Sequence, residues 1–254
     1  MLTTVNIKKS FGGVHALRSV DMELSPGKLT SVIGPNGAGK SSLMNVISGF
    51  TQPTSGEVFL DKRRLNGLAP HEVCKLGIAR TFQNLQMFSH MPAWEVTATG
   101  CFRSQKASRL SDLLGLSSSR NEMQRSEQRA AELLDFVELE DTWRNRKAGD
   151  LPYGLQRKLE ISRALATSPA WLLLDEPAAG LNTAETAALG KLLKKISATG
   201  VSLVLIEHDL DLVLDISDEV YVMDAGSVIS RGKPEEVRND PKVIAAYIGT
   251  DSDD

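Results

Sequence analysis

The sequence predicts an α/β fold interrupted by a mainly helical segment. Two short apolar runs, "LTSVIG" at residues 29–34 and "WLLLDEP" at residues 171–177, are typical of strands buried on both faces of a parallel sheet. A helical pattern that stops at a glycine occupies residues 183–200 and leads to a third run, "VSLVLIEHD", at residues 201–209. From about residue 84 to 165 the pattern is mostly helical, so we expect an insertion there.

Further strands are expected toward both ends of the chain. Residues 2–11 and 19–28 read as half-buried strands, and a Pro-Gly turn closes the second. Residues 56–65 are interpreted as an edge strand. Residues 218–234 predict a hairpin that turns at an Ala-Gly pair, and residues 240–249 predict a last short helix before an acidic end.

The composition excludes several classes of protein. The chain has 254 residues, enough for one large domain or two small ones, and a net charge of −3, whereas a nucleic-acid binder usually shows a basic excess. No apolar run approaches the roughly 20 residues that span a bilayer, and the N-terminus lacks the apolar region of a secretory signal. Any membrane role is therefore expected to come through a partner.

The strongest motif is a glycine loop that follows the first buried run and opens a helical pattern. Gly34, Gly39, Lys40 and Ser41 fit G-x-x-x-x-G-K-[ST]. Glycines let such a loop curl its backbone N–H groups around phosphates, the lysine reaches the β- and γ-phosphates, and the hydroxyl can ligate Mg²⁺. The strand–loop–helix context supports the motif, so the sequence predicts a nucleotide-binding site.

A second motif lies at the end of the run at residues 171–177. Asp175 stands where a carboxylate can hold Mg²⁺ through water, and Glu176 can polarise a water that attacks a γ-phosphate. Alone, these residues would be read as an acidic turn after a strand. With the glycine loop in the same chain, we interpret them as functional.

The complete set of motifs, in this order, resembles the ATP-binding subunits of ATP-binding cassette (ABC) transporters. In isolation Gln83 and His208 are unremarkable, and Phe11 could belong to the core or stack on an adenine ring. In this family's order, however, they match the Q-loop glutamine, the switch histidine and the adenine-stacking aromatic. "LPYGLQ" takes the signature position and "AAGLN" the D-loop. The resemblance covers essentially the whole chain.

The resemblance implies a role for each matching residue. ATP contacts are expected from Phe11, Gly34, Pro35, Asn36, Gly37, Ala38, Gly39, Lys40, Ser41 and Ser42. Catalytic roles are expected for Glu176, His208 and Gln83, and Mg²⁺ ligation for Ser41, Gln83 and Asp175. The D-loop residues are Gly180, Leu181 and Asn182. The signature, which would act on the ATP of a partner subunit, is formed by Leu151, Pro152, Tyr153, Gly154, Leu155 and Gln156.

The resemblance also implies the fold and its division. We expect a P-loop NTPase (RecA-like) core with an antiparallel β subdomain, formed by residues 1–83 and 166–233. A helical subdomain that carries the signature is expected at residues 84–165, and a C-terminal helix with an acidic tail at residues 234–254.

The signature departs from the usual family pattern, L-S-G-G-Q. Pro152 replaces a serine and so removes a hydroxyl and a backbone N–H. Tyr153 replaces a glycine, which is familiar in one branch of the family, and Leu155 replaces a glutamine. One hypothesis is that the ATP site closed by this signature hydrolyses poorly while the other site in the pair is competent. The alternative is that members of the branch tolerate any residue at Pro152.

That branch is the larger ATPase of branched-chain amino acid importers, whose relatives also serve amides, urea and other small solutes. It is indicated by "RTFQNLQMF" at residues 80–88, the long insertion, the signature tyrosine and the ending "DPKVIAAYIG" at residues 240–249. The branch implies two transmembrane permeases, a second ATPase subunit (a different one or a copy), a periplasmic or extracellular solute-binding protein acting indirectly, and a place on the cytoplasmic face of the inner membrane. Leu85, Met87 and Phe88 are either a permease-docking surface or local core.

Two functions of other classes remain as alternatives. A soluble ABC-type ATPase acting on nucleic acid or ribosomes usually carries two cassettes, a coiled coil or basic extensions, and this chain has one cassette and a net negative charge. A P-loop kinase for a small metabolite would leave His208 and the signature segment without a role.

Overall fold

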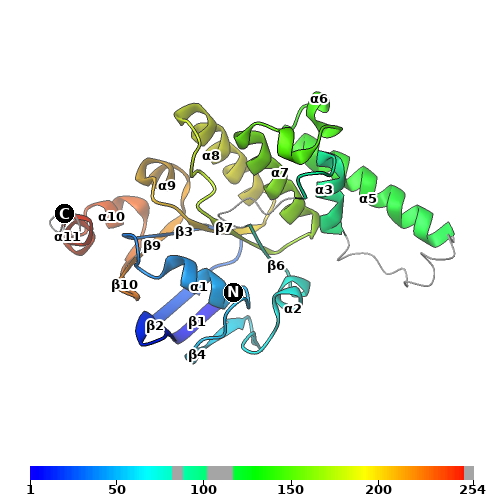
Figure 1. The fold of residues 1–254 in the computed structure, drawn as a ribbon. Coiled ribbons are helices and arrows are strands. Elements are labelled where there is room, and N and C mark those ends of the chain that lie inside the picture. Colours follow the sequence, from blue (N-terminus) through cyan, green and yellow to red (C-terminus); the bar gives the residue numbers. More distant parts are fainter. Residues whose placement is uncertain (82–87, 102–116, 249–254) are drawn as a thin grey trace. The chain divides into compact units, whose positions relative to one another are not determined.

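The computed structural model describes residues 1–81, 88–101 and 117–248 (Figure 1). The chain divides into two compact units. Unit 1 combines residues Met1–Arg80 with Ala170–Asp254, and unit 2 comprises Thr81–Pro169. Each unit is described by itself below.

Unit 1 is built on a ten-stranded sheet in the order β5-β4-β1-β2-β10-β9-β3-β8-β7-β6. The strands β9, β3, β8, β7 and β6 are parallel, whereas β5, β4, β1 and β2 pair antiparallel. The α/β fold with an antiparallel β portion, predicted from the sequence, is therefore confirmed. The bounds are β1 Leu2–Phe11, β2 Val14–Leu24, β3 Leu29–Ile33, β4 Ser55–Leu60, β5 Arg63–Arg64, β6 Ile78–Arg80, β7 Trp171–Asp175, β8 Ser202–Ile206, β9 Glu219–Asp224 and β10 Ser227–Gly232.

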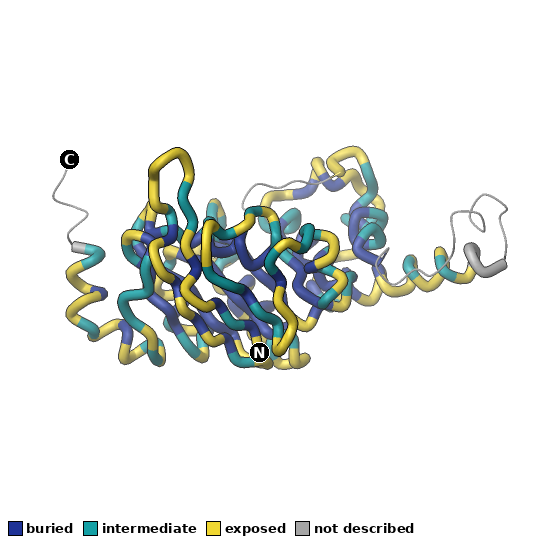
Figure 2. Tube along the Cα trace, turned by 90° about the horizontal axis from the view of Figure 1, so that it is seen from below, coloured by how far each residue is buried: buried dark blue, intermediate teal, exposed yellow. Residues whose placement is uncertain are grey.

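The central strands of unit 1 are buried along their whole length. Every residue of β3, β7 and β8 is buried, which explains why their sequences are mostly apolar. Figure 2 colours the buried residues of the chain dark blue. Because the three strands are parallel neighbours, their carboxyl ends meet at one edge of the sheet. That edge is where a doubly wound sheet binds ligands.

Six helices flank the sheet within unit 1. They are α1 Lys40–Ile47, α2 Pro70–Lys75, α8 Thr183–Ser197, α9 Leu210–Ile216, α10 Pro234–Arg238 and α11 Pro241–Ile248. Helix α8 illustrates how the sequence specifies them. Asn182 and Glu185 form a reciprocal capping box at its start, and Leu189, Leu193 and Ile196 line its buried face. The predicted hairpin at Ala225-Gly226 is present between β9 and β10.

Unit 2 is helical where the structure describes it. Its elements are α3 Ala93–Thr99, α5 Ser117–Phe136, α6 Asp141–Arg144, the 3₁₀ turn η2 Ala148–Asp150 and α7 Tyr153–Ala166. Helices α3, α5 and α7 pack on one another, and each carries a fully buried apolar residue, Val96, Leu134 and Leu159 respectively. A buried contact of 2.8 Å between the hydroxyls of Thr97 and Ser162 links α3 to α7.

Two sequence-based expectations were wrong in detail. Residues 56–65 are a hairpin rather than one edge strand, because Asp61 adopts a positive φ of 53° and turns β4 back into β5. The sequence at residues 108–128 also favours a helix interrupted by a serine-rich loop, but its serines Ser117–Ser119 belong to α5. Over the described ranges, no helix is long and apolar enough to cross a membrane.

Candidate nucleotide-binding site

The glycine loop connects β3 to α1 at the edge where the parallel strands end (Figure 1). Gly34 has φ +147°, and a Cβ there would lie 2.0 Å from the carbonyl oxygen of Met223. Gly39 has φ +98°, and its Cβ would lie 2.4 Å from the carbonyl oxygen of Ala16. Both positions therefore require glycine. No side chain caps the start of α1, so its first N–H groups can bind an anion.

Lys40 is the first residue of α1 and its side chain turns back over the loop. It is buried, and its Nζ donates to the carbonyl oxygens of Gly34 at 2.7 Å and Pro35 at 2.9 Å. Burial lowers the pKa of the Lys40 ammonium, and the nearby carboxylates of Glu176 and Asp175 oppose that shift. The ammonium is thus a buried donor among loop carbonyls, where phosphate oxygens would be stronger acceptors.

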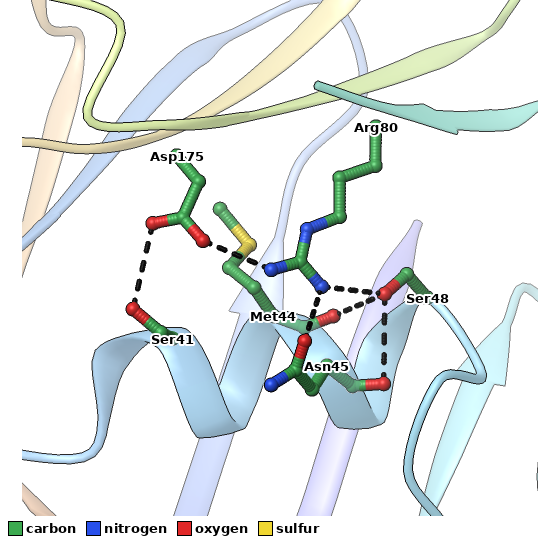
Figure 3. A network of polar contacts seen from close by, with 6 residues as sticks. All are labelled: Ser41, Met44, Asn45, Ser48, Arg80 and Asp175. Carbon is green, nitrogen blue, oxygen red and sulfur yellow. Dashed lines mark hydrogen bonds and ion pairs between the residues drawn. The ribbon is translucent and has the colours of Figure 1, made fainter. Parts of the chain in front are cut away.

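Asp175 ends β7 and presents its two carboxylate oxygens to different partners (Figure 3). The hydroxyl of Ser41 lies 3.5 Å from Oδ1, and Nη2 of Arg80 donates to Oδ2 at 2.9 Å. The facing hydroxyl and carboxylate are the donors that Mg²⁺ takes from a protein when phosphates complete its shell. The residues present therefore fit a magnesium site, although no group of three or more His, Cys, Asp or Glu side chains suited to a metal occurs in the described part of the chain.

Arg80 is a site residue that the sequence analysis missed. It ends β6, and its side chain and that of Asp175 are 6% and 5% exposed. Its Nη1 donates to Asn45 Oδ1 on α1 at 2.7 Å and to Oγ of Ser48, the C-cap of α1, at 2.9 Å. Burial lowers the pKa of the guanidinium and Asp175 opposes the shift. The sequence could have indicated Arg80 in one way: it is a charged residue at the end of the short strand Ile78–Arg80, three positions before Gln83.

Glu176 follows Asp175 and has an unusual backbone. Its φ is +47°, a left-handed conformation that is uncommon outside glycine and asparagine. Its N–H donates to Ile206 O at 2.9 Å, and its carbonyl accepts from Ala179 N at 3.2 Å. Such strain costs on the order of 1–3 kcal/mol and is concentrated at functional sites. The turn places the Glu176 carboxylate close enough to the ammonium of Lys40 to affect its pKa.

Glu207, also missed by the sequence analysis, ties His208 to the segment after Glu176. It is fully buried, and its two carboxylate oxygens accept from Ala178 N at 2.7 Å and His208 N at 3.2 Å. The side chain of His208 is itself 63% exposed. Burial raises the pKa of Glu207, and the two backbone donors oppose that shift. Glu207 thus holds the backbone of the predicted switch histidine in place.

A charge-neutral replacement of Glu207 gives a pH-dependence prediction. Because the folded-state pKa of Glu207 is raised above its ordinary 4.5, the folded chain binds this proton more tightly than the unfolded chain. The contribution of Glu207 to stability is fully present below pH 4.5, the ordinary pKa of the group, and is lost as the pH rises through the folded-state pKa. Denaturant unfolding of wild type and Glu207→Gln from pH 4.5 upward should give a stability difference, wild type minus variant, that falls with pH. A stability difference between wild type and Glu207→Gln that does not change with pH would contradict this prediction. The control is Glu235→Gln, at an exposed carboxylate of α10.

A family model described as "ABC transporter" matches residues 17–179, which span the glycine loop, the signature segment and Asp175-Glu176. This chain belongs to the ABC transporter ATPase family. A second model, "Branched-chain amino acid ATP-binding cassette transporter", matches residues 227–253 of this ABC ATPase.

Relatives of the ABC ATPase match over its whole length. The high-affinity branched-chain amino acid transport ATP-binding protein LivG of Escherichia coli K12 is 40% identical over 250 residues, 98% of each chain. The crystal structure of a nucleotide-free ATP-binding cassette from an ABC transporter has 36% identity and a TM-score of 0.84, covering 98% and 99% of the two chains. An ADP conformation of such a cassette has 34% identity and a TM-score of 0.83, covering 98% of each chain. Nucleotide binding and ATP hydrolysis follow from membership.

Two further parts of the predicted site, Phe11 and the D-loop segment, lie in unit 1. Phe11 is 48% exposed at the end of β1, with Lys9 Nζ 4.7 Å from its ring centroid, so the alternative that it belongs to the core was wrong. In the D-loop, Gly180 has φ +82° and Asn182 caps α8 with its side chain. Gln83, Leu85 and Met87 lie outside the described residues.

The predicted signature, residues 151–156, spans the start of α7 in unit 2. Pro152 is the N-cap, and no side chain caps the helix. Tyr153 is 41% exposed, and Arg157 Nη2 donates to its hydroxyl at 2.6 Å. The Gln156 amide donates to Leu151 O at 2.7 Å. The N–H groups of Leu155 and Gln156 donate to Pro152 O at 2.9 and 3.0 Å. An anion at this helix start would therefore be bound by the N–H groups of Tyr153 and Gly154, since Pro152 contributes no N–H. Near the start of unit 2, Phe88 is 55% exposed and so is not local core.

Proposed function

We propose that this ABC ATPase is the ATP-hydrolysing subunit of an importer for branched-chain amino acids or related small solutes. The observation that carries the proposal is the match to LivG over 98% of both chains, including the C-terminal residues 227–253 that a branched-chain-specific model also matches. The alternative, an ATPase that acts on nucleic acid or ribosomes, has no supporting observation.

The site supports a mechanism of ATP hydrolysis in which the predicted residues take the following roles. Lys40 and the N–H groups of the glycine loop would bind the β- and γ-phosphates. Ser41 and Asp175 would hold Mg²⁺, with Gln83 as the further predicted ligand, and the ion supplies charge neutralisation at the phosphates when bound. Glu176 would orient or deprotonate the attacking water, and His208 and Gln83 would sense the γ-phosphate.

The signature would act in trans. A helix start with unpaired N–H groups attracts a phosphate, so Leu151–Gln156 would face the ATP held by the glycine loop of a second ATPase subunit. Closing and opening of this pair would move two transmembrane permeases as rigid bodies, with exposed Phe88 near the docking surface, at the cytoplasmic face of the membrane.

The decisive experiment isolates the assembly. The tagged chain is purified from native membranes in mild detergent, and co-purifying proteins are identified by mass spectrometry. Two permeases and a second, smaller ATPase are expected, and deletion of the gene should abolish uptake of labelled leucine or of the solute bound by the accompanying binding protein. Recovery only from the soluble fraction, with ribosomal or other soluble proteins, would overturn the proposal.

The proline of the signature gives a further prediction. Pro152→Ser restores a hydroxyl and a backbone N–H at the N-cap of α7, and one charge-assisted hydrogen bond to phosphate contributes about 1.5–3 kcal/mol. We expect steady-state ATP turnover of the purified complex to rise severalfold. Ala184→Ser, which adds a hydroxyl in the first turn of α8, is the control. Unchanged turnover in Pro152→Ser would mean that this branch tolerates proline here and that the two ATP sites do not differ for this reason.

A further inference from the structure

The buried arginine at the end of β6 occupies one side of the carboxylate that the proposed function assigns to Mg²⁺. Arg80 and Asp175 are both almost fully buried, and Nη2 of Arg80 lies 2.9 Å from Oδ2 of Asp175. Oδ1, the other oxygen, is the one that faces Ser41. The two oxygens of one carboxylate are therefore divided between the arginine and the predicted metal position (Figure 3).

The guanidinium is itself held by the helix that carries Ser41. Nη1 donates to Asn45 Oδ1 at 2.7 Å and Ser48 Oγ at 2.9 Å, and Ser48 Oγ donates to Met44 O at 2.6 Å. A guanidinium is planar and presents its donors in a fixed fork, so contacts at Nη1 set the direction of Nη2. The orientation of Asp175 relative to Ser41 is thereby determined by α1 through Arg80.

We propose that Arg80 is the positioning residue that presents Oδ1 of Asp175 to Mg²⁺. The inference rests on the proposed function. By engaging Oδ2, the fork removes the carboxylate rotamers that would turn Oδ1 away from Ser41. Hydrogen-bond partners behind a metal-ligating carboxylate typically change metal affinity 10–100-fold when they are removed. A lysine keeps the charge but has no fork, so it cannot hold Asn45, Ser48 and Asp175 in one plane.

The test separates a metal-specific effect from a loss of structure. Binding of a fluorescent ATP analogue to the full chain is measured in Mg²⁺ and in EDTA, and the ratio of the two affinities gives the gain due to the metal. In Arg80→Lys this gain should fall about 10-fold or more, while affinity in EDTA changes less than about threefold. Arg231→Lys, at an exposed arginine whose Nε lies 2.7 Å from Glu219 Oε1, should change neither quantity.

An unchanged gain would overturn the inference, and an unchanged gain with equal losses of affinity in Mg²⁺ and in EDTA would mark a purely structural pair. If Arg80→Lys does not fold, Asn45→Ala leaves the ion pair in place and removes one acceptor of Nη1. Its metal-dependent gain should fall severalfold, and an unchanged gain would again overturn the inference. Failure of the wild-type chain to bind the analogue would instead count against the proposed function, so the two failures are distinguishable.

Discussion

Glu176→Gln is expected to leave ATP binding intact and to lower ATP turnover of the assembled ABC complex by a factor of about 10²–10⁴. Glutamine keeps the shape of the side chain but cannot accept a proton from the attacking water. The left-handed backbone of Glu176, held by the hydrogen bond from its N–H to Ile206 O, is retained because the substitution adds no Cβ branch.

The measurement combines equilibrium binding of ATP with phosphate release by the complex purified from membranes. The control is Glu235→Gln, at an exposed carboxylate of α10 in the same unit, which should behave as wild type. Normal turnover in Glu176→Gln would refute the role assigned to this residue. Loss of ATP binding together with turnover would show instead that Glu176 supports the phosphate site.

Gly34→Ala should abolish nucleotide binding and destabilise the chain by about 2–6 kcal/mol, the sum of backbone strain and overpacking. The added Cβ would lie 2.0 Å from Met223 O, a backbone atom of β9 that cannot rotate away. Either β9 shifts away from β3 or the loop leaves its path. In both cases the carbonyl oxygens of Gly34 and Pro35 no longer surround Lys40.

This prediction has a matched control in Gly200→Ala. Gly200 also has a positive φ, +91°, but a Cβ there meets nothing within 4 Å, so only backbone strain of about 1 kcal/mol is expected. Denaturant unfolding and binding of a fluorescent ATP analogue distinguish the two variants. Equal destabilisation of both, with nucleotide binding kept in Gly34→Ala, would contradict the steric argument.

Part of the site could be anticipated because its chemistry is local in the chain. The glycine loop, Lys40 and Ser41 lie within eight consecutive residues, and Asp175 with Glu176 ends one strand. The apolar runs of β3, β7 and β8 predict a parallel sheet for the same reason, since burial on both faces leaves no room for alternation. The roles of the predicted catalytic residues stay predictions.

The sequence by itself determined the α/β class, the order of the motifs and the family. These depend on residue types and on spacings along the chain. Only the tertiary structure decided that Arg80 shares Asp175 with Ser41, and that Glu207 joins the backbone at Ala178 to that at His208. The partners in these contacts are up to 134 residues apart. They meet because β3, β8, β7 and β6 are adjacent parallel strands whose carboxyl ends share one edge, and strand order is set by packing of the whole sheet.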